Sequence, residues 1–165
     1  MATENKNLSH YNKAEIPDAK AMRFGLVVSE WNNQITEPLF QGAYEALLNC
    51  GALATNIIRW NVPGSFELTY GCKKMMKTHT LDAVIAIGSV IRGETSHFDY
   101  VCSATADGIK DLNVLFDTPV IFCVLTDNTI QQAKDRSGGK HGNKGTEAAI
   151  AAIKMAVLDD MGHKV

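Results

Sequence analysis

Apolar positions along the chain follow two patterns: short unbroken runs, and stretches in which they recur at about every third or fourth residue. An unbroken run of about four to eight apolar residues is typical of a strand buried on both faces of a parallel sheet. Four such runs predict strands at residues 23–29, 55–60, 83–90 and 119–126.

Helical spacing fills the intervals between these runs. We expect the first helix to have Thr36 as its cap and to end at Gly51, because Thr accepts hydrogen bonds at helix starts and glycine tolerates the backbone that closes a helix. Asn143 is expected to cap the last helix, after a glycine-rich break at residues 138–142. The other helices are predicted at residues 65–77, 97–115 and 129–137.

Strands that alternate with helices pair in parallel through right-handed crossovers. The expected fold is therefore a single three-layer α/β domain of flavodoxin-like type, with a four-stranded parallel sheet flanked by helices. Its expected span is residues 21–165, and the polar residues 1–20 are expected to form an N-terminal arm. The total of 165 residues suits one domain.

Composition narrows the class of protein. The chain is 45% hydrophobic and 21% charged, as globular proteins are, and its net charge of −2 gives no support to nucleic-acid binding. Neither a membrane-spanning run nor a signal peptide is visible, so we expect a cytoplasmic protein without a membrane partner. The dispersed cysteines are expected to be reduced thiols rather than disulfides or zinc ligands: Cys50, Cys72, Cys102 and Cys123.

Candidate functional residues follow the carboxyl ends of the predicted strands, where open α/β sheets bind ligands. Trp31 is either a partly buried anchor or a surface on which a heteroaromatic ring stacks. Glu67 either complements a helix dipole or accepts hydrogen bonds from a polyhydroxylated ligand. Arg136 is either a solvated last-turn cation or a phosphate clamp.

The segment GSVIRGETSHFDY, residues 88–100, is the most informative of these junctions. It follows a buried strand and leads into a helix, whose free N–H groups favour an anion. His97 stands at the helix start, and histidine is the side chain suited to both giving and accepting a proton near neutral pH. The phosphate-loop pattern GxxxxGK[ST] and the dinucleotide pattern GxGxxG are both absent.

Five segments together carry a family resemblance: VVSEWNNQIT, VPGSFEL, GSVIRGETSHFDYV, PVIFCVLT and DRSGGKHGNKG. In their order and spacing the chain resembles the 6,7-dimethyl-8-ribityllumazine synthases, transferases of the penultimate step of riboflavin biosynthesis. The resemblance implies condensation of 5-amino-6-(D-ribitylamino)uracil with 3,4-dihydroxy-2-butanone 4-phosphate, with release of phosphate. The family needs no metal or organic cofactor, so none is expected.

The resemblance also assigns roles to residues. His97 matches the proton donor, Trp31 the ring that stacks on the pyrimidine, and Arg136 the phosphate-binding arginine. Phe122 matches a residue that the neighbouring subunit contributes to the pocket. The other implied substrate-binding residues are Ser65, Phe66, Glu67, Ser89, Val90, Ile91, Glu94, Thr95 and Lys144.

Assembly is implied as well, because family members form pentamers with active sites between adjacent subunits. The short GGKHGNKG break resembles the linker of members that pack twelve pentamers into a sixty-subunit shell, which can enclose riboflavin synthase. The N-terminal arm is expected to add a strand to a neighbour's sheet. Two other interpretations stay open: a flavin- or nucleotide-binding module without catalysis, and a mainly structural cage.

Overall fold

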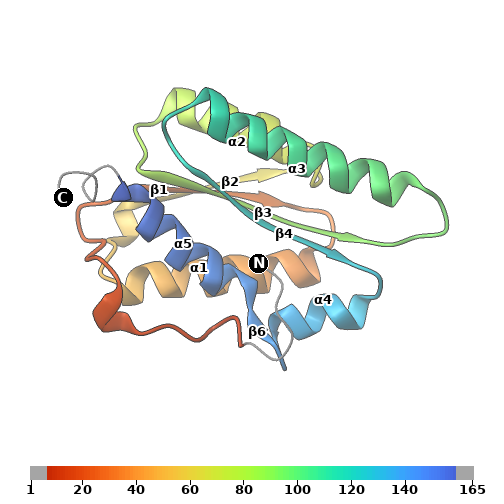
Figure 1. Cartoon of the computed structure of the whole chain (residues 1–165), viewed down its shortest axis with the longest axis horizontal. Helices are drawn as coiled ribbons and strands as arrows, with labels where there is room; N and C mark the ends of the chain where they lie inside the picture. The colour runs from red at the N-terminus through yellow and green to blue at the C-terminus, as the bar shows by residue number, and fades with distance from the viewer. Residues whose placement is uncertain (1–6, 159–165) are drawn as a thin grey trace.

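Parallel strands organise the chain, of which the computed structural model describes residues 7–158 (Figure 1). The sheet has four strands in the order β2-β1-β3-β4, all paired in parallel. Their bounds are β1 Phe24–Ser29, β2 Ile57–Val62, β3 Ala83–Ile91 and β4 Val120–Asp127. The predicted strands are confirmed, with ends that differ by one or two residues.

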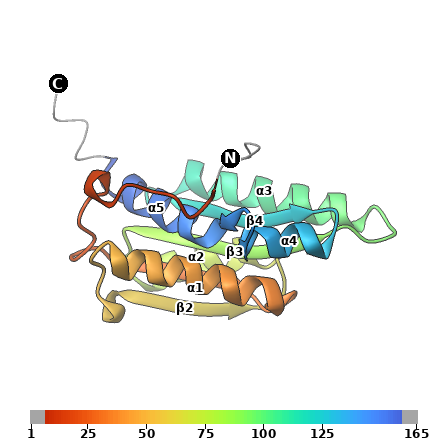
Figure 2. The same cartoon turned by 90° about the horizontal axis from the view of Figure 1, so that it is seen from below.

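Helices cover both faces of this sheet, as Figures 1 and 2 show. One face packs against α1, Asn33–Asn49, and α5, Lys144–Ala156. The other face packs against α2, Leu68–Thr78, and α3, His97–Leu115, whereas the short α4, Ile130–Arg136, lies beside the end of β4. The predicted three-layer α/β architecture is confirmed.

Side chains of one strand alternate between two hydrophobic clusters. Leu26 and Ile85 belong to the cluster beneath α1 and α5, whereas Val27 and Val84 belong to the cluster beneath α2 and α3. All four side chains are fully buried. Burial on both faces is why these strands are continuous apolar runs rather than alternating ones.

The start of the first helix was predicted wrongly. Helix α1 begins at Asn33, after Asn32 in the left-handed region with φ of 59°, so Thr36 lies inside the helix rather than at its cap. The buried Thr36 hydroxyl donates a hydrogen bond to the Ser29 carbonyl at 2.7 Å. A tertiary contact with the end of β1 therefore uses the oxygen that local preference assigned to capping.

Two other boundaries differ from the predictions. Residues 54–56 form a 3₁₀ turn before β2 instead of its first residues, and α2 begins at Leu68 rather than at Ser65. The glycine-rich break contains a small antiparallel pair that the sequence did not indicate, β5 Ser137–Gly139 with β6 Gly142–Asn143.

Asn143 caps α5 as predicted and also joins two helices. Its side chain accepts a hydrogen bond from the Gly145 N–H at 2.8 Å and donates one to the Pro38 carbonyl of α1 at 2.8 Å. The described part of the arm, residues 7–20, packs on its own chain near this point. The Leu8 N–H donates to the His141 carbonyl at 2.8 Å, and the Asn143 N–H donates to the Ser9 hydroxyl at 2.9 Å.

Among the helices formed by residues 7–158, none combines the length and the apolar character needed to cross a bilayer.

The tight packing of Gly145, in α5, against the backbone of α1 generates a prediction about stability. A Cβ atom added to Gly145 would lie 1.8 Å from the Leu39 carbonyl oxygen, so Gly145→Ala must push the helices apart. We expect it to lower the free energy of unfolding by about 1–3 kcal/mol or more, measured by urea denaturation. Gly93→Ala is the control, because a Cβ atom there meets nothing within 4 Å. Equal midpoints for the two variants would contradict this packing.

Candidate functional site

A pocket of about 530 Å³ opens at the carboxyl edge of the sheet, on the side of α2 and α3. It is formed by the loops that follow β1, β2 and β3, together with the first turns of α3. Most of the residues expected to bind substrate line this pocket: Trp31, Ser65, Phe66, Glu67, Ser89, Val90, Ile91, Thr95 and His97.

Two aromatic side chains stand exposed at the pocket. Trp31 is 71% exposed and Phe66 is 60% exposed, although large aromatic side chains gain free energy from burial. The Trp31 N–H donates to the Pro63 carbonyl at 3.1 Å, which ties the loop after β1 to the loop after β2. Trp31 is therefore not a buried anchor in this chain, and its ring face is available for stacking.

Two buried serine hydroxyls also line the pocket. Within residues 7–158, the Oγ atoms of Ser65 and Ser89 have no hydrogen-bond partner, although Ser89 is only 1% exposed. A buried hydroxyl without a partner is costly, so such groups call for an explanation in the function of the site.

Asn32 is a residue at this site that the sequence analysis missed. Its side-chain amide donates to the Ser89 carbonyl at 2.9 Å, and its left-handed backbone turns the chain from β1 into α1. Asn tolerates that conformation better than most residues, so the Asn-Asn pair after the strand was the available signal. Asn32 holds the end of β3 in place beside the Trp31 loop.

His97 is the first residue of α3 and borders the pocket. Its backbone N–H donates to the Thr95 hydroxyl at 3.4 Å, a long contact. Among the described residues, no side chain makes a hydrogen bond or ion pair with the imidazole, which is exposed. The ring is thus free to exchange a proton with a ligand, and the helix backbone alone places it.

Four of the expected substrate-binding residues do not line this pocket: Glu94, Phe122, Arg136 and Lys144. Glu94 is exposed on the loop before α3, and Phe122 is partly exposed on the edge strand β4. Lys144, at the start of α5, pairs with Glu147 at 2.7 Å. A single chain therefore does not bring the whole expected set together.

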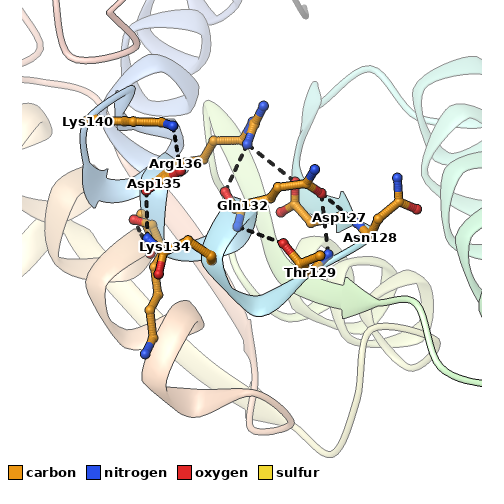
Figure 3. Close-up of polar contacts among 10 residues, drawn as sticks. Asp127, Asn128, Thr129, Gln132, Lys134, Asp135, Arg136 and Lys140 are labelled. Atoms are coloured by element: carbon orange, nitrogen blue, oxygen red, sulfur yellow. Dashed lines mark hydrogen bonds and ion pairs between the residues drawn. The ribbon is translucent and has the colours of Figure 1, made fainter.

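Arg136 ends α4 and lies beside a buried carboxylate (Figure 3). Its Nη1 donates to the Gln132 carbonyl at 2.9 Å and lies 3.7 Å from Asp127 Oδ1. Asp127 is 8% exposed, and its Oδ2 has no partner among the described residues. Burial raises the pKa of the Asp127 carboxyl, and the Arg136 charge opposes this only in part.

The described part of the chain holds no cluster of His, Cys, Asp and Glu side chains that fits a metal ion. All four cysteines are free thiols, and burial raises the pKa of both Cys72 and Cys123 to about 12. These two thiols stay protonated at neutral pH, so they serve as core residues rather than nucleophiles.

Comparison with known proteins identifies the family of the chain. A model of the 6,7-dimethyl-8-ribityllumazine synthase family matches residues 21–160. The 6,7-dimethyl-8-ribityllumazine synthase of Flavobacterium johnsoniae is 70% identical over 96% of this chain and 83% of its own length. The enzymes of the same name from Christiangramia forsetii and Phocaeicola vulgatus are 67% and 57% identical, over 96% and 94% of this chain and 95% and 92% of their own lengths. The chain belongs to the 6,7-dimethyl-8-ribityllumazine synthase family.

Family membership confirms the resemblance drawn from the five sequence segments. The matched region begins just after the polar arm and includes the whole sheet and every helix from α1 to α5. The roles of the individual site residues stay predictions.

The carboxyl beside Arg136 generates a pH prediction. A folded-state pKa raised above the ordinary 3.8 means that the stability linked to Asp127 is fully present below pH 3.8 and is lost as the pH rises through the folded pKa. Asp127→Asn cannot ionise and avoids that loss. We therefore expect the stability of this variant, relative to wild type, to increase with pH from about 4 and then to level off. Urea denaturation across this range measures it, and a pH-independent difference would contradict the raised pKa.

Proposed function

We propose that the chain condenses 5-amino-6-(D-ribitylamino)uracil with 3,4-dihydroxy-2-butanone 4-phosphate to give 6,7-dimethyl-8-ribityllumazine and inorganic phosphate. The observation that carries this proposal is the pocket in which an exposed aromatic ring, two unpartnered buried hydroxyls and a free imidazole meet. This set suits a flat, polar, hydroxyl-rich ligand that must exchange protons. It supports a transferase of riboflavin biosynthesis.

Stacking and hydrogen bonds would hold the first substrate. Trp31 offers its face to the pyrimidine ring, and Ser65 and Ser89 offer hydroxyls to the polar edge or to the ribityl chain. Fixing two reactants in one orientation removes much of the entropic cost of a bimolecular condensation. The other residues proposed to line this part of the site are Phe66, Glu67, Val90 and Ile91.

Proton transfer would carry the chemistry. The amine of the uracil adds to the ketone carbonyl, and water leaves to form an imine. Loss of the neighbouring C–H proton and of phosphate gives an enol, which tautomerises to a new ketone. The ribitylamino nitrogen then adds to this ketone, and loss of water closes the ring. His97 would protonate leaving oxygens and recover the proton at the next addition. Every step is an addition, an elimination or a proton shift, so the residues of the chain require no redox cofactor for it.

The phosphate would be bound by Arg136, together with the loop that carries Glu94 and Thr95. Arg136 has a half-exposed guanidinium with donors to spare beyond the Gln132 carbonyl. A charge-assisted contact both places the phosphate and stabilises the charge that develops as it leaves.

Phe122, Arg136 and Lys144 lie outside the pocket of the single chain, so we propose that adjacent subunits complete each site. This fits the pentamers of the family, and the short linker favours their packing into a sixty-subunit cytoplasmic shell that can enclose riboflavin synthase. Residues 1–20 would form the arm of the domain at residues 21–165, and the arm would add a strand to a neighbour.

The catalytic proposal predicts a kinetic result. Purified protein should accelerate lumazine formation, followed by absorbance and mass spectrometry, above a protein-free control. His97→Ala should slow turnover by about 10²–10⁴-fold without abolishing it, because orientation still accelerates the condensation. His79→Ala is the matched control, since His79 follows α2 at the opposite edge of the sheet, beside Trp60.

The same assay separates the roles of His97 and Arg136. Arg136→Ala should raise KM for the phosphate substrate by about 10- to 100-fold, as expected for a lost charge-assisted hydrogen bond. An unchanged KM would contradict the phosphate clamp, and full activity in His97→Ala would contradict the proton role. Binding of the uracil without any acceleration would instead favour a binding module.

The assembly proposal predicts that the protein sediments as a particle of sixty subunits, which negative-stain microscopy should show as hollow. Free pentamers alone would overturn the shell, whereas monomers at the concentration of the kinetic assay would overturn the shared site as well.

A further inference from the structure

Arg92 makes several side-chain contacts close to the pocket, although it does not line the pocket itself. Its guanidinium forms a two-pronged contact with Asp99 of α3, with Nη2 to Oδ1 at 2.9 Å and Nη1 to Oδ2 at 3.4 Å. Its Nε donates to Asn128 Oδ1, in the loop after β4, at 3.0 Å. One planar group therefore joins the start of α3 to the loop after the neighbouring strand.

The same guanidinium also stacks on a pocket wall. Its carbon lies 4.2 Å from the centre of the Phe98 ring, and Phe98 is buried and lines the pocket. Phe98 and Asp99 directly follow His97 in the first turn of α3. Arg92 thus contacts two of the three residues that open the helix on which the imidazole stands.

The position of the His97 side chain depends on these contacts of Arg92, because no polar contact within the described part of the chain holds the imidazole directly. Its imidazole has no hydrogen-bond or ion-pair partner within residues 7–158. The preceding loop, residues 93–96, is exposed and includes Gly93, where an added Cβ atom would meet nothing within 4 Å. The position of the ring is therefore set by the first turn of α3, which Arg92 holds.

Asn128 extends the connection to the phosphate arginine (Figure 3). Its N–H donates to the Gln132 side chain at 2.9 Å, and the Gln132 carbonyl accepts from Arg136 at 2.9 Å. The backbone N–H of Arg92 donates to the Asp127 carbonyl at 3.0 Å, next to the same loop. The start of α3 and the turn that opens α4 are thus tied together through Arg92.

We propose that Arg92 is a positioning residue for the condensation: it holds the first turn of α3 against the loop after β4 and thereby places the imidazole of His97 relative to the substrates. The proposal rests on the function proposed above. It assigns Arg92 no contact with substrate, since Arg92 does not line the pocket and each of its nitrogens already donates to Asp99 or Asn128.

Because the ion pair between Arg92 and Asp99 is exposed, the positioning role of Arg92 can be tested without unfolding the protein. The side chains of Arg92 and Asp99 are 44% and 57% exposed, and exposed ion pairs contribute little to global stability. Arg92→Lys keeps the charge but replaces the planar fork by a single ammonium, which cannot reach both partners in one plane. The variant is therefore expected to fold and assemble as the wild type does.

The chain offers a closely matched control in Arg59. Arg59 forms a two-pronged ion pair with Glu37 and lies 4.3 Å above the Phe40 ring, but on β2 and away from this pocket. Arg59→Lys therefore removes the same kinds of contact elsewhere. We expect Arg92→Lys to lower kcat by about 10- to 100-fold with KM for the uracil unchanged, the scale expected for a misplaced catalytic group. Arg59→Lys should leave both constants unchanged.

A double-variant cycle tests whether Arg92 acts through His97. In a His97→Ala background, Arg92→Lys should cause no further loss of kcat, since the group that it positions is gone. Losses that multiply would overturn the proposal, as would a kcat of Arg92→Lys equal to that of the wild type. If Arg92→Lys fails to assemble in sedimentation, Asn128→Ala replaces it in the same cycle, because it removes the Nε contact and leaves the Asp99 pair intact.

The failure of this inference is distinct from failure of the proposed function. Wild-type protein that does not accelerate lumazine formation overturns the function itself. Active wild type with a fully active Arg92→Lys variant overturns only the role of Arg92.

Discussion

Parallel pairing of four strands, each packed between helices, is the constraint on which the rest of this structure depends. Because the strands point the same way, every loop that leaves a strand toward the next helix emerges at one edge of the sheet. The pocket is made where three of these loops meet the first turns of α3. No single loop has to fold into a binding site by itself, because the sheet brings them together.

The loops at this edge are held by specific polar contacts rather than by burial. Asn32 ties the loop after β1 to the end of β3, Thr36 ties α1 back to β1, and Arg92 ties α3 to the loop after β4. The contacts of Asn32 and Arg92 join segments 57 and 36 residues apart along the chain, whereas the Thr36 contact joins consecutive elements. A rigid edge with an open pocket is what a reaction between two bound substrates requires, since orientation supplies much of its rate.

The distribution of unpartnered groups separates two regions of the chain. Within residues 7–158, the hydroxyls of Ser65 and Ser89 at the pocket have no hydrogen-bond partner, and neither has Oδ2 of Asp127, beside Arg136 at the end of β4. Arg136 does not line the pocket that contains the two serines. This separation is the physical reason for proposing that two copies of the chain complete each active site.

The sequence by itself determined the three-layer architecture, the order of strands and helices along the chain, and most of the residues that line the pocket. Continuous apolar runs of strand length favoured buried parallel strands, and both ends of α3 were predicted because its apolar spacing persists throughout. The family motifs identified most of the pocket residues, because the motif segments lie at the ends of strands, where the pocket forms. Tertiary structure decided what local preference could not. The Thr36 hydroxyl donates a hydrogen bond to the Ser29 carbonyl instead of capping a helix. Asn32 binds the end of β3, and Arg92 binds α3 and the loop after β4. The partners Ser89 of Asn32 and Asn128 of Arg92 are far apart in sequence, and spacing along a chain carries no information about contacts that exist only once the sheet has formed.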